Sequence, residues 1–316
     1  MPVGYVEAKF PISQRYAGNS EFVLGYNTLK GTIRYVDSNV SGGVAGNGLS
    51  WAGAYLTINA AVVGSSADDT ILVAPNHTET ITAAAGISVN KAGLSIIGLG
   101  RGSRKPTVTF GTSTATDINV SAANVLIKNL RLVNGIDSLV NFLDLDEDWF
   151  FGEDLDFVTS SALEAVGFIN LATTKDNFYF RGLTALQPSD PTGSDGAVDT
   201  GFLFMIDSEN IVVEDSSFYG NFETAIFHNR TTACKNFWVR NCQGIQSLSG
   251  AEPFQLVSGA NGGCYGGGFN TPAEAAATEA TLVGTLGNDF FISPTTGFGN
   301  DGGAGGQGGI IVATAS

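Results

Sequence analysis

Six short segments repeat one alternation pattern along the middle of this 316-residue chain. Each segment opens with Gly, Asn or Asp, has apolar residues at its second and fourth positions, and has Gly, Asn, Asp or Glu at its sixth. The opening residues are Gly93, Asn124, Asp148, Asn177, Asn210 and Asn236. They lie 24 to 33 residues apart, so a constant segment is joined by loops of varying length. Period-2 alternation between turn residues predicts a short β-strand in each segment.

Further apolar runs lie between these segments, so each repeat carries at least two strands and almost no helical pattern. The runs are 139–145, 166–171, 202–206, 225–227 and 254–257. Such a chain buries its inward face by coiling, and successive coils stack in parallel about 4.8 Å apart. A doubly wound fold would need helices between the strands. The repeat therefore predicts an all-β chain that forms a parallel β-helix, with Gly and Asn at the bends.

The alternation also predicts which side chains face outward. The second and fourth positions are apolar throughout and form the interior, so the third and fifth positions face out. The fifth positions are mostly charged, and Glu214 is expected between Arg181 and Arg240 of adjacent coils. The third positions are apolar or aromatic and predict a subunit interface formed by Leu126, Phe150, Tyr179, Val212 and Trp238.

Three explanations of this outward apolar row remain open. A segment of the same chain covers it, identical subunits bury it, or its rings stack on sugars. Burial between identical subunits is the preferred explanation, and a closed trimer is the expected assembly. Trp238→Asp is then expected to reduce the molar mass in solution while leaving the strand content intact.

The repeat divides the chain into four segments. Residues 1–30 lack the repeat and predict a docking arm whose aromatic residues are Tyr5, Phe10, Tyr16, Phe22 and Tyr26. Residues 31–65 lead into the β-helix, and Ser50 is expected to cap a helix over 51–63 that closes the first coil. The β-helix is expected over 66–258. Residues 259–316 are Gly-rich, with a helix candidate at 272–280 and a strand candidate at 289–293.

Composition narrows the classes of partner. Lys and Arg total 15 against 30 Asp and Glu, giving a net charge of −15, which repels nucleic acid and anionic membranes. No apolar run approaches the roughly 18 residues of a membrane span, and the first residues show no secretion signal. The three cysteines suit synthesis in a reducing compartment, and Cys242 is expected to be a small core residue.

Residues 69–110, with the runs Thr-Ile-Leu-Val-Ala-Pro and Gly-Leu-Ser-Ile-Ile-Gly-Leu-Gly, resemble the first coils of the pectin-lyase-like superfamily. The resemblance extends over about 33–258 and implies a right-handed parallel β-helix. This superfamily includes polysaccharide lyases, glycosidases and pectin esterases, and also tail spikes and capsid-decorating cement proteins of tailed phages.

The short aromatic arm and the few ionic residues are most similar to the virion proteins. That similarity implies a homotrimeric decoration protein, made in the host cytoplasm, that binds the major capsid protein on the capsid surface. It also implies no catalysis and no cofactor. A tail spike or another polysaccharide-binding or depolymerising β-helix is the alternative.

A search for catalytic groups supports no assignment of catalytic or metal-binding residues. The superfamily's glycosidase motifs are absent, since neither His77 nor His228 lies in Gly-His-Gly and Asp68-Asp69 precedes the first strand. The densest acidic cluster is Asp144, Asp146, Glu147, Asp148, Glu153, Asp154 and Asp156. It fits a solvated face, a calcium site or a catalytic pair. It lacks a nearby basic residue, which disfavours a lyase, and the basic group Arg101, Arg104 and Lys105 is expected in a solvated loop.

Overall fold

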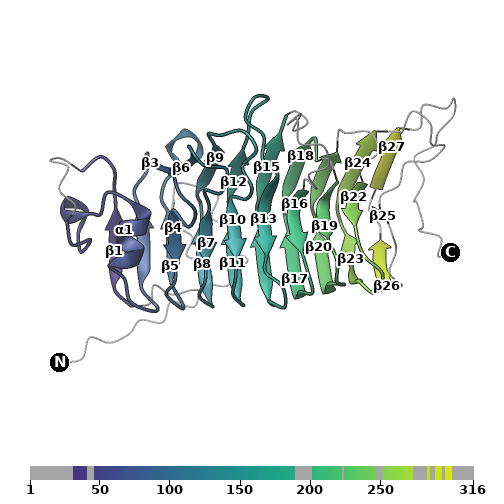
Figure 1. Ribbon diagram of the computed structural model, residues 1–316, viewed down its shortest axis with the longest axis horizontal. Helices are drawn as coiled ribbons and strands as arrows, with labels where there is room; N and C mark the ends of the chain where they lie inside the picture. Colours follow the sequence, from purple (N-terminus) through teal and green to yellow (C-terminus); the bar gives the residue numbers. More distant parts are fainter. Residues whose placement is uncertain are drawn as a thin grey trace.

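The chain winds into a right-handed parallel β-helix in which successive coils stack along one axis (Figure 1). The computed structural model describes residues 31–40, 46–188, 201–222, 224–246, 252–272, 283–284, 289–293 and 296–300. Each complete coil contributes one strand to each of three sheets, named sheet A, sheet B and sheet C in chain order, and every pairing between their strands is parallel in this part of the chain. The predicted fold class is confirmed.

The three sheets together contain all the strands of the described residues. Sheet A contains β1 (Ile33–Val36), β2 (Thr70–Val73), β5 (Ser95–Gly98), β8 (Val125–Lys128), β11 (Phe150–Glu153), β14 (Phe178–Arg181), β17 (Glu209–Glu214), β20 (Lys235–Arg240), β23 (Asn261–Tyr265) and β26 (Asp289–Ser293). Sheet B contains β3 (Thr78–Ile81), β6 (Thr107–Phe110), β9 (Arg131–Asn134), β12 (Asp156–Val158), β15 (Thr184–Gln187), β18 (Ser217–Gly220), β21 (Gln243–Gln246), β24 (Gly268–Pro272) and β27 (Thr296–Asn300). Sheet C contains β4 (Ile87–Val89), β7 (Ile118–Val120), β10 (Leu143–Leu145), β13 (Gly167–Leu171), β16 (Gly201–Met205), β19 (Ala225–Asn229), β22 (Glu252–Gln255) and β25 (Val283–Gly284).

Left-handed residues mark both ends of the strands in sheet A. Asn124 (φ 61°) and Asn129 (φ 56°) bracket β8, whereas in β20 Asn236 (φ 54°) is the second residue and Asn241 (φ 50°) follows the last. Asparagine tolerates this backbone conformation better than most residues because its short side chain bonds locally. The corner asparagines also bond to one another across coils: the Nδ2 of Asn236 donates to the Oδ1 of Asn210 at 2.7 Å. The asparagines that recur in the repeat therefore favour the sharp bends.

The register of β11 differs from the sequence prediction by one residue. Trp149 (φ 62°), not Asp148, occupies the left-handed corner. Phe150 therefore pairs with Val125, points inward and is 1% exposed, so its assignment to the outward interface is wrong. Phe151 takes the outward position instead, because a shift of one residue exchanges the two faces of a strand.

Phenylalanine rings fill the interior of the prism, which is the space enclosed by the three sheets. Phe142, Phe157, Phe168 and Phe202 are fully buried and pack against one another across coils. The Phe142–Phe157 centroids lie 5.5 Å apart at an interplanar angle of 76°, and the Phe157–Phe202 centroids lie 5.4 Å apart at 85°. These edge-to-face contacts are a favoured geometry for aromatic rings. The apolar positions predicted by the repeat thus form one continuous core.

The helix expected over residues 51–63 is two separate elements. Ser50 caps a 3-10 turn, η1 (Trp51–Gly53), while Thr57 caps α1 (Ile58–Val63). The intervening Tyr55 forms a parallel bridge with Val36, which requires extended backbone and interrupts the helix. Figure 1 shows α1 at the N-terminal end of the solenoid, where it packs against β1, β2 and β4. A second 3-10 turn, η2 (Gly102–Arg104), precedes β6.

The sheets continue past residue 258, where the sequence analysis ended the β-helix. The predicted strand at Asp289–Ser293 is β26 and pairs with β23, while Pro272, the expected start of a helix, ends β24. Residues 1–30, residues 273–280 and residues 301–316 lie outside the described residues. Of the helices that are described, none has the length and apolar character of a membrane span.

Candidate functional site

The outward side chains of β14, β17 and β20 form a mixed aromatic and charged strip, here called the sheet A surface. Its members are Tyr179, Arg181, Val212, Glu214, Trp238 and Arg240. Parallel register places Tyr179, Val212 and Trp238 in one row. It places the three charged residues in a second row. Glu214 therefore lies between Arg181 and Arg240 of the adjacent coils, as the sequence predicted.

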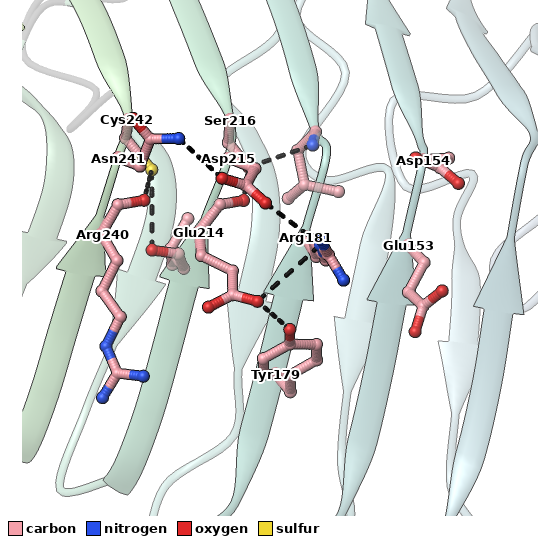
Figure 2. Close-up of polar contacts among 12 residues, drawn as sticks. Glu153, Asp154, Tyr179, Arg181, Glu214, Asp215, Ser216, Arg240, Asn241 and Cys242 are labelled. Atoms are coloured by element: carbon pink, nitrogen blue, oxygen red, sulfur yellow. Dashed lines mark hydrogen bonds and ion pairs between the residues drawn. The ribbon is translucent and has the colours of Figure 1, made fainter. Parts of the chain in front are cut away.

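Polar contacts on the sheet A surface join three successive coils (Figure 2). The hydroxyl of Tyr179 donates to the Oε1 of Glu214. The Nε of Arg181 lies 3.8 Å from that same oxygen and donates to the Oδ2 of Asp215 at 3.2 Å. The Nδ2 of Asn241 completes the chain of contacts by donating to the Oδ1 of Asp215 at 2.7 Å. These polar groups are satisfied by one another.

The environment of Tyr179 keeps its phenol protonated. Burial and the hydrogen bond to Glu214 raise the pKa of Tyr179 well above its ordinary value. A phenol that serves as a general base needs a pKa near the working pH. At neutral pH the Tyr179 hydroxyl is therefore a hydrogen-bond donor that links β14 to β17.

Arg240 has different neighbours from Arg181. Its guanidinium lies 5.9 Å from the ring of Trp238 and 5.6 Å from the ring of Tyr265 on β23, both within the range of a cation–π contact. Among the described residues, no carboxylate lies within ion-pair distance of Arg240. On the sheet A surface, the guanidinium of Arg240 therefore retains N–H donors that no carboxylate of the described residues accepts from.

The predicted interface row lies on one sheet, but it is not uniformly exposed. Leu126 is only 4% exposed and belongs to an outer apolar cluster with Leu72 and Ile97. Tyr179, Val212 and Trp238 are half-buried, and Phe151 replaces Phe150 beside them. A role for this row in subunit contact stays a prediction. The predicted docking-arm residues Tyr5, Phe10, Tyr16, Phe22 and Tyr26 lie outside the described residues.

The acidic cluster that is compact in sequence is spread over three faces of the solenoid. Asp144 faces outward from sheet C and accepts from the Nδ2 of Asn170 at 2.7 Å. Glu153 lies on sheet A, where its Oε2 is 2.5 Å from the Nζ of Lys128. Asp156 lies on sheet B, where its Oδ1 is 2.9 Å from the Nζ of Lys105. No three His, Cys, Asp or Glu side chains of the described residues are grouped to hold a metal ion.

The expectation that this cluster lacks basic neighbours is wrong, because residues from other coils supply them. Lys105 comes from the basic group that was expected in a solvated loop, yet it is buried. Burial lowers the pKa of Lys105, and the nearby Asp156 partly opposes that effect. Lys128 and Lys105 lie one and two coils, respectively, before their acidic partners in the chain. The number of residues between the partners depends on loop length, so the sequence alone did not reveal the pairs.

We expect Asp144→Asn to raise the melting temperature at pH 7. Burial raises the pKa of Asp144, and repulsion from Asp146 adds to this shift. A carboxyl whose pKa is raised in the folded state destabilises the protein as pH rises through that pKa. The gain in melting temperature of the variant should therefore disappear below pH about 4, where the carboxyl is protonated in both states. Thermal melts from pH 3 to pH 8 measure the difference.

The matched control is Glu147→Gln, which removes a carboxylate of the same cluster that lies 3.2 Å from the Nζ of Lys175. It should not raise the melting temperature. Equal gains from the two substitutions would mean that reduced net charge, rather than the position of Asp144, causes the effect.

The sequence analysis missed one outward aromatic residue, Tyr265. Tyr265 lies in the Gly-rich region assigned outside the β-helix, although the alternation of Cys264 and Tyr265 continues the strand pattern. Cys264 is buried and Tyr265 is 39% exposed. The prediction for Cys242 is confirmed, since it is fully buried and burial raises its pKa to about 12.

Comparisons with known proteins give no family. No family model matches the chain, and a comparison with curated proteins finds no match. Among solved structures, a rhamnogalacturonan lyase is similar with a TM-score of 0.41 and 11% identity, covering 84% of this chain and 88% of its own. The pectate lyase Pel9A is similar with a TM-score of 0.40 and 14% identity, covering 86% of this chain and 78% of its own. Neither likeness carries an argument about function.

Proposed function

We propose that this chain is a structural protein of a tailed-phage virion, a trimeric capsid decoration protein that binds the major capsid protein. The supporting observation is a set of side chains on sheet A that bond to one another across coils, formed by Tyr179, Arg181, Glu214, Asp215 and Asn241. Such contacts favour a rigid scaffold over a site with free reactive groups. The resemblance to virion β-helices supports the same role.

In this role the solenoid holds apolar arms over joints between shell subunits. Each aromatic side chain that is buried on docking contributes roughly 1.5–3 kcal/mol. Three arms on one trimer act together, since the second and third contacts form at high effective concentration. Residues 1–30 are the proposed arm, and their five aromatic residues are Tyr5, Phe10, Tyr16, Phe22 and Tyr26.

Deletion of residues 2–26 is expected to abolish binding to empty shells without unfolding the solenoid. The arm precedes β1 in sequence, so its removal takes away the proposed docking contacts and leaves the sheets. Co-sedimentation with shells measures binding, and circular dichroism together with a thermal melt measures folding. Full decoration by the truncated, folded chain would contradict the docking role.

Polysaccharide binding is the second candidate, and the environment of Arg240 favours it. The rings of Trp238 and Tyr265 offer apolar faces to a sugar chain, and the guanidinium of Arg240 beside them offers a charged hydrogen-bond donor. The half-buried Trp238 and the 39% exposed Tyr265 are the accessible parts of this group.

If the second candidate holds, Trp238→Ala and Tyr265→Ala should each weaken polysaccharide binding at least tenfold in affinity electrophoresis. Trp149→Ala is the control, because Trp149 is exposed at a corner away from Arg240. New reducing ends or unsaturated products would show depolymerisation. Unchanged mobility of the wild-type chain with host polysaccharides would exclude binding of those sugars.

A further inference from the structure

A continuous apolar row runs along the outer face of sheet B. Parallel register aligns one outward residue from each of β9, β12, β15, β18 and β21. These residues, here called the sheet B row, are Val133, Val158, Leu186, Tyr219 and Ile245. At a strand spacing of about 4.8 Å, the row is about 19 Å long and one side chain wide.

The sheet B row is the more exposed of the two outward apolar rows. Leu186 is 47% exposed, Tyr219 37% and Ile245 44%. On sheet A, by contrast, Leu126 is 4% exposed and Tyr179, Val212 and Trp238 are half-buried. A contiguous exposed apolar row on a rigid sheet marks an interaction surface.

The charge around the row indicates which partner fits. The outward positions of β15, β18 and β21 are Thr184, Leu186, Ser217, Tyr219, Gln243 and Ile245, and none is charged. The same coils carry Arg181, Glu214 and Arg240 on sheet A. Beside the row on β9 and β12 lie Arg131 and Asp156, whose opposite charges pair at 3.8 Å. Copies of a chain with a net charge of −15 repel one another, so they associate best where the outward positions are uncharged, as they are on β15, β18 and β21.

We propose that the sheet B row is the surface through which copies of this chain associate. The row is straight and parallel to the stacking direction, so copies placed around a common axis bring equivalent side chains together, as closed symmetric assemblies require. The hydroxyl and amide groups of Thr184, Ser217 and Gln243 flank the row and form its polar rim. This inference deepens the proposed trimer by moving the subunit contact from sheet A to sheet B.

The row alone covers less area than the roughly 800 Å² per partner of a standard interface. Association is therefore expected to depend on concentration. Light scattering coupled to size-exclusion chromatography, over a range of loading concentrations, should give the wild type two or three times the chain mass of 32.7 kDa.

The double variant Leu186→Asp, Ile245→Asp should elute at the monomer mass with an unchanged circular dichroism spectrum. Both side chains are exposed, so the charges do not enter the core. Val140→Asp is the matched control, because Val140 is 45% exposed and lies outside sheet B, and its mass should remain that of the wild type. Trp238→Asp should also keep the wild-type mass. Its loss of mass, with no effect of the double variant, would place the contact on sheet A and overturn the proposal.

Thiol cross-linking tests the contact without disturbing it. Leu186 belongs to the middle strand of the row, so it meets its own copy whether the subunits run parallel or antiparallel. Leu186→Cys should give cross-linked dimers with a short thiol-specific reagent, and Val140→Cys should not. The native Cys234, Cys242 and Cys264 are buried, so they give little background.

Three results would overturn this inference. They are a monomeric wild type at every concentration, a double variant that keeps the wild-type mass, and a Leu186→Cys thiol that is shielded within a monomer by the chain's own segments. The shell-binding assay is separate: a monomer that still decorates shells would overturn this inference and leave the docking role standing.

Discussion

Phe168→Ala is expected to lower the free energy of unfolding by about 3–5 kcal/mol. Phe168 is fully buried, and its ring centroid lies 5.3 Å from that of Phe142, 5.5 Å from Phe202 and 5.7 Å from Phe222. The truncation leaves a cavity among rings from several coils, which cannot all move to fill it. Urea denaturation followed by circular dichroism measures the loss.

The matched control for this core truncation is Phe151→Ala, which removes the same ring from a half-buried outward position. Its effect should be well under half that of Phe168→Ala, because less apolar surface returns to water. Equal losses would mean that the rings inside the prism contribute no more than the rings outside it.

Asn134→Asp is expected to cost about 3–5 kcal/mol although the two side chains have nearly the same shape. Asn134 is 4% exposed, and its Nδ2 donates to the carbonyls of Leu163 at 3.0 Å and Glu164 at 2.7 Å. The substitution leaves two carbonyls without that donor, at roughly 1–3 kcal/mol each, and places a carboxylate against them.

The cost of Asn134→Asp should also depend on pH. Burial and the two facing carbonyls raise the pKa of the new carboxyl above its ordinary value of about 3.9. The variant should therefore recover part of its stability below pH about 4 and lose it as pH rises. Asn39→Asp, at an exposed position, should change little at any pH. A pH-independent loss at residue 134 would contradict the burial of an ionised group.

The sequence was sufficient for the fold because the corner and core positions repeat. Asn124, Asn177, Asn210 and Asn236 open their segments and all have positive φ. The prediction of register was wrong at β11, because the consecutive aromatic residues Trp149, Phe150 and Phe151 fit the alternation in either frame. The lead-in helix failed for another reason, since the pairing of Tyr55 with Val36 is a contact between distant residues.

The surface was harder to predict than the core because its contacts join different coils. The partners Lys105 and Asp156 are paired only after the lengths of the intervening loops are known. The sheet B row, however, has a local signal that the sequence analysis did not use. Each of its five residues lies nine positions after a left-handed corner residue of sheet A, as in Asn177 to Leu186 and Asn236 to Ile245.

This constant interval has a consequence for how such a chain changes during evolution. From β8 to β24, each strand of sheet B begins three residues after the preceding strand of sheet A ends, whereas the other connections vary in length. Insertions and deletions are therefore tolerated on two edges of the prism and opposed on the third. Duplication of a whole coil would lengthen the molecule by about 4.8 Å and add one more residue to the row in phase.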